Sequence, residues 1–321
     1  MRAIVVTRKG GPEVLEVTKR PDPAPGPGEV LIDVAASGVN FIDVYFRTGL
    51  YPVERPYVPG VEGAGTVASV GEGVTGLAPG DRVAWAQVQG SYAERAVVPA
   101  DQIIPLQDGV SFEDGAAALL QGMTAHYLTH STYAIQPGDT VLVHAAAGGV
   151  GLLLTQLSKH LGARVIATVS TSEKGKLAQD AGADEVLVGY DGFSDKVRAL
   201  TSGKGVAAVY DGIGAPTFEG SLASLRQRGT LALYGAAGGP VPPFDPQALN
   251  RAGSLFLTRP SLAHHLATRE ELTTRAGDIY GWVASGDLRL HIGNRYPLDE
   301  VPTAHEDLEA RRSTGKLLII P

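Results

Sequence analysis

Residues 140–162 read TVLVHAAAGGVGLLLTQLSKHLG. An apolar run at 140–145 leads into the small-residue turn Ala146–Gly151, and apolar residues at helical spacing follow it. Glycines at 148 and 149 let the backbone approach a pyrophosphate, Gly151 lets the helix pack close to the strand, and the helix N-terminus offers N–H groups to an anion. The turn therefore predicts a dinucleotide site, although alanine stands at 146 where the usual fingerprint has its first glycine.

The same rhythm of strand and helix extends through the centre of the chain. Short apolar strands are expected at 140–145, 163–169, 185–189, 206–210, 230–235 and 254–258, with helical stretches at 149–162, 172–182, 194–203 and 216–229. Apolar strands separated by helices indicate a parallel sheet covered on both faces. We therefore expect an α/β domain over residues 123–259, with a doubly wound, six-stranded parallel Rossmann sheet.

The flanking segments follow a different pattern. Residues 1–122 hold short β-branched runs between turn-rich segments such as PDPAPGPG (21–28), which predicts a β-rich domain. Residues 260–321 contain one helical segment, 269–286, and end in the strand KLLII, so they do not continue the alternation. We expect residues 260–321 to return to residues 1–122 and complete that domain, leaving a cleft between the two domains.

Composition excludes several classes of protein. The chain has 321 residues, of which 44% are hydrophobic and 19% charged, as in a water-soluble globular protein. A formal net charge of −7 gives no field that would attract nucleic acid. Cysteine is absent, which excludes disulfides, thiolate metal sites and cysteine nucleophiles. No signal peptide or membrane-length apolar run is present, so we expect a cytoplasmic protein with no membrane partner.

Other motifs offer no competing chemistry. His126 and His130 have the spacing of a zinc protease, but the glutamate required after the first histidine is Tyr127. His144 ends the first strand of the sheet, where we expect a hydrogen-bonded structural histidine. The chain has no Gly-x-Ser-x-Gly elbow, and neither Gly203-Lys204 nor Gly315-Lys316 is followed by serine or threonine, which argues against hydrolase and P-loop sites.

The end of the second strand indicates which dinucleotide is preferred. An NAD site usually has an acidic residue here that binds the ribose hydroxyls. This chain instead has Ser170, Thr171 and Ser172, with Lys174 following. Hydroxyls and an ammonium group suit a 2′-phosphate, so we expect NADPH rather than NADH.

Motifs along nearly the whole chain resemble one family, the zinc-free quinone oxidoreductases of the medium-chain dehydrogenase/reductase superfamily, which include the ζ-crystallin-like proteins. The matching segments are VNFIDVYFRTGLY (39–51), PGVEGAGTV (59–67), PGDRV (79–83), LQGMTAHYL (120–128), HAAAGGVG (144–151), VYDGIG (209–214), LFLTRPSL (255–262) and GKLLIIP (315–321). The resemblance implies a GroES-like fold for the β-rich domain. It also implies a homodimer formed through the sixth strand.

The zinc alcohol dehydrogenases of the same superfamily are similar in architecture but carry a catalytic metal. Where they have a cysteine ligand, this chain has Asn40, and where they read Gly-His-Glu, it reads Gly60-Val61-Glu62. No cysteine stands near Gln121 either. These residues do not make a tetrahedral zinc site. Without a Lewis acid, hydride must pass to an electron-poor acceptor such as a quinone or an activated alkene.

The resemblance also implies roles for individual residues. Asn40 and Asp43 have the spacing of a helix N-cap and its acidic N3 partner, and the resemblance adds that this segment lies under the nicotinamide. As catalytic residues we expect Asn40, Tyr45 and Tyr51, with the tyrosines lining the acceptor pocket. The residues expected along the cofactor are Asn40, Tyr45, Thr124, Ala147, Gly148, Gly149, Val150, Ser170, Lys174, Tyr190, Ile213, Tyr234, Gly235, Leu257 and Arg311. Arg312 follows Arg311, which leaves the arginine assignment open between the two.

Together these features predict a zinc-independent, NADPH-dependent quinone oxidoreductase that transfers hydride in the interdomain cleft. One alternative is a zinc-free reductase of alkenals, enones or enoyl double bonds. A second is an NADPH-binding structural or interaction protein with negligible turnover.

Overall fold

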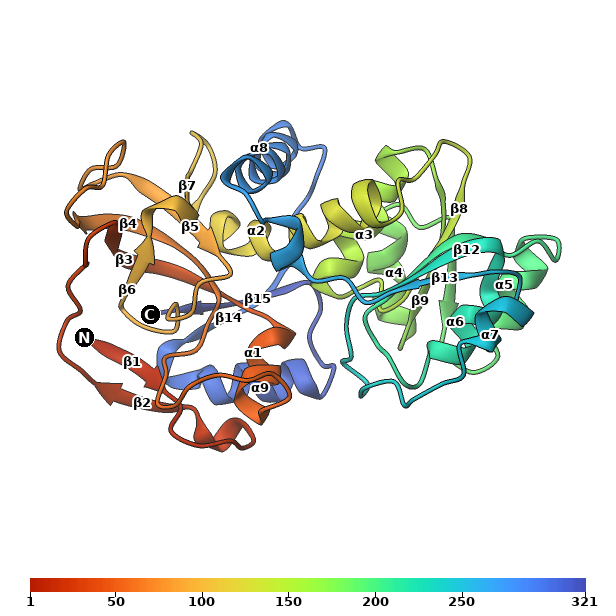
Figure 1. The fold of residues 1–321 in the computed structure, drawn as a ribbon, viewed down its shortest axis with the longest axis horizontal. Coiled ribbons are helices and arrows are strands. Elements are labelled where there is room, and N and C mark those ends of the chain that lie inside the picture. The colour runs from red at the N-terminus through yellow and green to blue at the C-terminus, as the bar shows by residue number, and fades with distance from the viewer. The chain divides into compact units, whose positions relative to one another are not determined.

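The structure is a computed structural model that describes all 321 residues. The chain divides into two compact units. Unit 1 comprises Met1–Met123 and Leu266–Pro321, and unit 2 comprises Thr124–His265. The sequence predicted that unit 2 would span residues 123–259, so both predicted boundaries lie slightly earlier in the chain than those of the structure. Both ends of the chain lie in unit 1 (Figure 1).

Unit 2 is built on one parallel sheet. Its strands are β8 (Thr140–Val143), β9 (Arg164–Val169), β10 (Glu185–Val188), β11 (Val206–Asp211), β12 (Leu225–Leu233) and β13 (Phe256–Thr258). They lie in the order β10-β9-β8-β11-β12-β13, and every neighbouring pair is parallel. This confirms the six-stranded doubly wound sheet. Because the strands are parallel, their carboxyl ends share one edge of the sheet.

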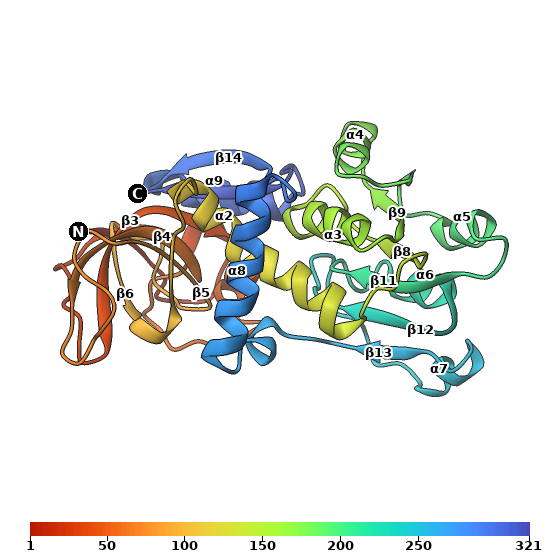
Figure 2. The ribbon, with the colours of Figure 1, turned by 90° about the horizontal axis from the view of Figure 1, so that it is seen from above.

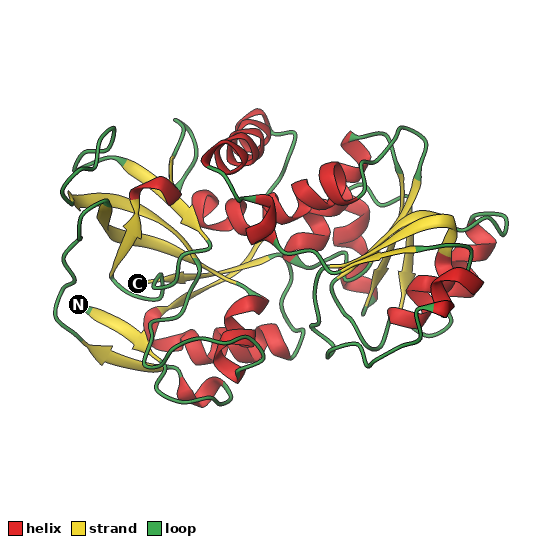
Figure 3. Ribbon diagram, viewed as in Figure 1, coloured by secondary structure: helices red, strands yellow, loops and turns green.

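Helices cover both faces of this sheet. In Figure 1, α3 (Gly149–His160) and α4 (Ser172–Asp180) lie on one side of it, and α5 (Phe193–Leu200), α6 (Phe218–Ser224) and α7 (Gln247–Arg251) lie on the other. Figure 3 shows the same layering, with yellow strands between red helices. A π-helical turn, η3 (Leu128–Thr132), precedes β8, and a 3₁₀ turn, η4 (Leu262–His265), follows β13.

The helix expected at 216–229 ends five residues early, because β12 already begins at Leu225. Leu225 is fully buried and pairs with Val206 of β11, so burial in the sheet overrides the helical pattern here. The core that this side of the sheet shares with α5 and α6 includes Leu142, Phe193, Val209, Leu222 and Leu231.

Unit 1 contains mostly antiparallel strands. Its larger sheet has the order β14-β15-β3-β4-β5-β7, and β6 also pairs with β3. The bounds are β3 (Glu29–Val39), β4 (Glu62–Val70), β5 (Arg82–Ala86), β6 (Arg95–Pro99), β7 (Ile103–Pro105), β14 (Ile292–Pro297) and β15 (Lys316–Ile320). A separate pair joins β1 (Arg2–Val5) to β2 (Glu16–Lys19).

Unit 1 also carries four helices, of which two were not predicted from the sequence. They are α1 (Phe41–Thr48), α2 (Phe112–Tyr127), whose residues from Thr124 on belong to unit 2, α8 (Arg269–Ser285) and α9 (Val301–Glu309). The short 3₁₀ turns are η1 (Pro12–Val14), η2 (Ala100–Gln102) and η5 (Leu298–Glu300). Figure 2 shows α2 and α8 running across each other. Helices α2 and α9 were not expected. The start of α2 nevertheless has a recognisable cap, since Ser111 Oγ accepts a hydrogen bond from the Asp114 N–H at 3.0 Å.

The last strand ties the two segments of unit 1 together. In β15, Leu317, Leu318 and Ile319 pair with Val39, Gly38 and Ser37 of β3. The C-terminal segment therefore completes the N-terminal sheet, as the sequence predicted. This register also places Lys316 beside the end of β3, where α1 begins. None of the helices is both long and apolar enough to cross a membrane.

Candidate functional site

The turn after β8 has the geometry of an anion-binding site. Helix α3 starts at Gly149 with Gly148 as its N-cap; no side chain caps it, and its first turn contains no acidic residue. The first N–H groups of α3 thus retain their capacity for an anion. The turn itself is strained, because Ala145 has a positive φ of 49°. A Cβ at Gly151 would stand 2.3 Å from the Ala145 carbonyl oxygen, so only glycine lets α3 pack this closely on β8.

Polar residues expected to select the nucleotide follow β9 and β10. Ser170 comes directly after β9 and is exposed. Thr171 caps α4, since its hydroxyl accepts a hydrogen bond from the Lys174 N–H at 3.3 Å. Lys174 therefore lies in the first turn of α4, and Tyr190 lies just beyond β10, with its ring 6.2 Å from the His144 ring. The structure brings these residues to the same edge of the sheet as the glycine turn.

The ends of β11 and β12 are joined through Asp211, a residue that the sequence analysis missed. The carboxylate Oδ1 of Asp211 accepts hydrogen bonds from the N–H groups of Ile213 (2.8 Å) and Gly214 (3.1 Å). Its carbonyl oxygen accepts from the N–H groups of Tyr234 (2.9 Å) and Gly235 (3.3 Å). Three of the expected cofactor positions (213, 234 and 235) are thus held by one buried aspartate. The aspartate in VYDGIG directly follows a strand, which was the available signal.

His144 belongs to the same buried network. One ring nitrogen lies 2.7 Å from Thr168 Oγ1 and the other 2.9 Å from Ser221 Oγ, which in turn donates to Asp211 Oδ2 at 2.8 Å. Burial lowers the pKa of His144, so the ring is held neutral. It links the ends of β8, β9 and β11, in keeping with the hydrogen-bonded structural role expected for it.

The remaining positions expected in unit 2 also lie in defined elements. Ala147 stands in the glycine turn, Val150 in the first turn of α3, Thr124 in α2 and Leu257 in the edge strand β13. His126 and His130 stack on each other, with ring centroids 4.3 Å apart, as a packing pair.

In unit 1, Asn40 begins α1, as the sequence predicted. Its backbone is extended, and the carboxylate of Asp43, at the N3 position, accepts a hydrogen bond from the Asn40 N–H at 3.0 Å. The Asn40 side chain turns elsewhere. Its Nδ2 donates to Glu62 Oε2 (3.0 Å) and to the Gly38 carbonyl (3.3 Å), while its Oδ1 accepts from Gln121 Nε2 (3.3 Å) and Lys316 Nζ (2.9 Å). All four hydrogen-bonding positions of the amide are therefore occupied within the protein.

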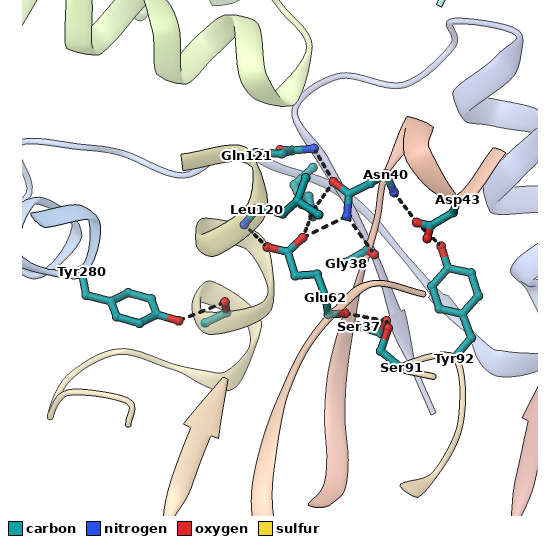
Figure 4. Close-up of polar contacts among 12 residues, drawn as sticks. Ser37, Gly38, Asn40, Asp43, Glu62, Ser91, Tyr92, Leu120, Gln121 and Tyr280 are labelled. Carbon is teal, nitrogen blue, oxygen red and sulfur yellow. Dashed lines mark hydrogen bonds and ion pairs between the residues drawn. The ribbon is translucent and has the colours of Figure 1, made fainter. Parts of the chain in front are cut away.

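Glu62 lies at the centre of these contacts and is completely buried. Its Oε1 accepts from the Leu120 N–H at 2.7 Å, and its Oε2 accepts from Asn40 Nδ2 and from Lys316 Nζ at 2.5 Å. Figure 4 shows Asn40, just before α1, and Leu120 of α2 bonded to this carboxylate, while Gln121 is bonded to the Asn40 amide. Lys316 and Glu62 form a buried ion pair, with 3% and 0% of their side chains exposed. Neither Glu62 nor Lys316 was among the expected site residues.

The two expected tyrosines form an aromatic cluster at the end of α1. The rings of Tyr45 and Tyr51 lie 5.2 Å apart at 59°, and Phe41 and Phe46 pack against them. The Tyr51 N–H donates to the Tyr45 carbonyl at 3.0 Å, after Gly49 ends α1 in a left-handed conformation. Both tyrosines are only half-buried.

A second buried network lies beneath Asn40 and was also missed by the sequence analysis. Arg47 Nη1 lies 3.0 Å from His305 Nδ1, His305 Nε2 lies 3.2 Å from Tyr92 OH, and Tyr92 OH donates to Asp43 Oδ2 at 3.1 Å. Because arginine only donates, the His305 proton sits on Nε2, and every donor in this chain points toward Asp43.

Burial sets the protonation of this second network. Burial first, and then the charge of Arg47, lower the pKa of His305 to about 3. Burial raises the pKa of Asp43 to about 7, against the lowering effect of its hydrogen bonds from Asn40 and Tyr92. The other oxygen of Asp43, Oδ1, is buried without a hydrogen-bond partner. Asp43 is therefore a carboxylate whose protonation changes near neutral pH.

The two candidate arginines differ in their surroundings. Arg312 is bound to Asp307, with Nε and Nη2 at 2.8 and 2.7 Å from one carboxylate oxygen. Arg311 has a left-handed backbone with φ 57°. Arg311 stays the position expected at the 2′-phosphate.

Comparisons with known proteins show which proteins this chain is similar to. Residues 26–108 match the alcohol dehydrogenase GroES-like domain, and residues 149–273 match the family described as zinc-binding dehydrogenase. The chain is 43% identical to a quinone oxidoreductase of Pseudomonas aeruginosa, with 97% of each chain covered. It is 39% identical to a 2-haloacrylate reductase of a Burkholderia species, over 99% of this chain and 98% of the relative. A mycobacterial structure complexed with NADPH is 55% identical and covers 100% of both chains, with a TM-score of 0.97.

The residues of this chain do not fit the zinc ion that one of these family descriptions implies. Nowhere in the chain do three or more histidine, cysteine, aspartate or glutamate side chains gather in a way that could hold a metal. Asn40 and Glu62 stand at positions that correspond to the metal-binding segments of the zinc alcohol dehydrogenases. In this chain both side chains already bind the Lys316 ammonium. One amide and one carboxylate around a resident cation leave no coordination site for a second one.

Proposed function

The chain belongs to the quinone oxidoreductase family of the medium-chain dehydrogenases/reductases, and from this premise we propose that it is a zinc-independent, NADPH-dependent quinone reductase. The family membership supports the reaction class, and the similar mycobacterial structure with NADPH supports the cofactor. When bound, NADPH supplies a hydride from its nicotinamide ring. The side chains of the protein contribute mainly by binding and orienting the reactants.

The observation that carries the cofactor assignment is the start of α3. Its N-terminus has no side-chain cap and no acidic residue, and it follows a turn made of Ala147, Gly148 and Gly149. These backbone N–H groups fit a diphosphate. The polar groups after β9, Ser170 and Lys174, fit the 2′-phosphate that distinguishes NADPH from NADH. Arg311 and Tyr190 are proposed at the same phosphate.

The acceptor must be electron-poor, because the donor set around Glu62 does not fit a Lewis-acid metal. A quinone meets this condition. We expect Tyr45 and Tyr51 to line the acceptor site, where their rings can stack on a flat molecule and their hydroxyls can donate to its oxygens. The Asn40 side chain has no remaining hydrogen-bonding capacity, so its expected role reduces to holding the start of α1. The reduced quinone can take its protons from water.

The test is an NADPH-oxidation assay with a panel of acceptors, monitored at the nicotinamide absorbance. We expect turnover with benzoquinones and naphthoquinones, unchanged by a chelator such as EDTA. A tenfold or smaller preference for NADPH over NADH, or activity that a chelator abolishes, would contradict the proposal.

A reductase of activated alkenes is the second candidate, and the similarity to a 2-haloacrylate reductase favours it. An alkene bearing an electron-withdrawing group is also an acceptor that needs no metal. The same assay separates the two: reduction of haloacrylates, alkenals or enones without reduction of any quinone would replace our first proposal.

We also propose a homodimer formed through β13, the edge strand of the unit 2 sheet. Phe256 in this strand is 61% exposed, and a strand at the edge of a sheet can pair with the same strand of a second copy. Light scattering of the wild-type protein and of Phe256→Asp measures the mass directly.

A further inference from the structure

Lys316 has the position and the contacts of a built-in cation. Its ammonium group lies 2.5 Å from Glu62 Oε2 and 2.9 Å from Asn40 Oδ1, and 3% of its side chain is exposed. Buried lysines are rare, and they persist when a carboxylate compensates the charge. Here the lysine comes from the last strand, β15, while its partners lie 254 and 276 residues earlier in the chain.

No other cation forms a hydrogen bond or an ion pair with Glu62. Besides Lys316, the titratable groups that its charge affects are Asp43, Tyr92 and Tyr280. The pKa of each is raised, first by burial and in addition by the negative charge of Glu62. In this buried part of unit 1, Lys316 is therefore the one cation in direct contact with the Glu62 carboxylate.

We propose that Lys316 takes the electrostatic place of a metal ion in this protein: its ammonium compensates Glu62, fixes the Asn40 amide, and so positions the start of α1 while leaving no room for zinc. Lys316 is thus a positioning residue rather than a catalytic one. The structural route is short, since Asn40 precedes α1 and α1 carries Tyr45. If the ammonium is removed, Glu62 loses its counter-charge and Asn40 Oδ1 loses one of its two donors.

The first arm of the test is a double-mutant cycle on equilibrium unfolding, followed by tryptophan fluorescence. Both tryptophans, Trp85 and Trp282, belong to unit 1, so they report on the unit that contains the ion pair. K316M leaves a buried carboxylate uncompensated and should raise the unfolding constant at least about a hundredfold. K316M/E62Q, which removes both charges, should return to within about tenfold of wild type. K19M, at an exposed lysine of β2, is the control and should change little.

If K316M does not fold but K316M/E62Q does, the outcome also supports the proposal, because it shows the same destabilisation and recovery at a larger magnitude. Equal destabilisation in the single and the double variant would overturn the proposal, because the lysine would then act through packing alone. The wild-type protein should also hold far less than one zinc per chain after incubation with the metal and gel filtration. One tightly bound zinc per chain would overturn the proposal as well.

The second arm rests on the proposed function, whereas the unfolding and zinc measurements do not, so the two can fail separately. K316A should lower kcat/KM for the quinone at least about tenfold while the NADPH dissociation constant changes less than twofold, since the expected nucleotide residues lie mostly in unit 2. Propylammonium, which replaces the part of the side chain that is lost, should restore quinone reduction, and 1-propanol should not. Equal effects of the amine and the alcohol would refute a role for the charge.

Discussion

Replacing Asp43 by asparagine should change how the stability of unit 1 depends on pH. Asp43 is completely buried, and its pKa is raised from 3.8 to about 7. Above its unfolded pKa, the folded state therefore retains a proton that the unfolded state has lost. It follows that Asp43 makes the free energy of unfolding fall as pH rises from about 4 to about 7, with no further effect above that range.

The size of this effect follows from the two pKa values. They differ by about 3, and each unit is worth about 1.4 kcal/mol, so the pH-dependent part can reach about 4 kcal/mol. Asparagine cannot ionise. It keeps an oxygen for the Asn40 N–H and the Tyr92 hydroxyl, but it places an amide nitrogen where Asp43 Oδ1 has no partner. That cost, about 1–3 kcal/mol, is the same at every pH.

The assay is urea unfolding of Asp43→Asn and wild type at pH 5, 6, 7 and 8, followed by tryptophan fluorescence and without nucleotide. The difference in the free energy of unfolding between variant and wild type should shift in favour of the variant as pH rises, and level off above about pH 7. Asp108→Asn, at an exposed aspartate of unit 1, is the control and should show no such shift. A constant difference between Asp43→Asn and wild type from pH 5 to 8 would refute the reasoning.

Further predictions concern both units. Gly151→Ala places a Cβ 2.3 Å from a backbone carbonyl, so it should cost about 1–3 kcal/mol and weaken NADPH at least tenfold in a fluorescence titration; Gly277→Ala, with nothing within 4 Å, is its control and should be neutral. Lys174→Ala should weaken NADPH at least about tenfold and NADH less than twofold, because only NADPH carries the 2′-phosphate; equal weakening would count against the assignment. Tyr92→Phe removes the hydroxyl that bonds to both His305 Nε2 and Asp43 Oδ2, and it should lower the free energy of unfolding by about 1–3 kcal/mol. The NADPH affinity, measured by calorimetry, should stay the same.

The fold was largely predictable because its signals are local. Each strand of the unit 2 sheet is an apolar run, and the glycine turn marks where α3 begins, so the six parallel strands and the turn before α3 could be predicted from sequence alone. The cap at Asn40 was predictable for the same reason. Helix α2 was not predicted because it is buried on all sides and therefore lacks an amphipathic pattern. Its only local signal was the capping residue Ser111.

The polar networks were not predictable from sequence, because they depend on contacts between distant residues. From the sequence, Lys316 is the first residue of a predicted strand, and none of its neighbours in the sequence indicates that its ammonium contacts Glu62. The same holds for His305, which follows Asp43 by more than half of the chain and meets it through Tyr92. Asp211 is the exception, since an aspartate at the end of a central parallel strand is a local signal that could have been used.

The pairing of β15 with β3 has a consequence for biosynthesis. Unit 2 is one continuous segment and can fold as soon as it leaves the ribosome, whereas the sheet of unit 1 stays incomplete until its final residues are translated. Throughout that interval the nascent chain carries Glu62 without its counter-ion, and the β3 edge that β15 will cover remains open to other strands. The emergence of β15 from the ribosome is thus the event that both neutralises this interior and closes its sheet.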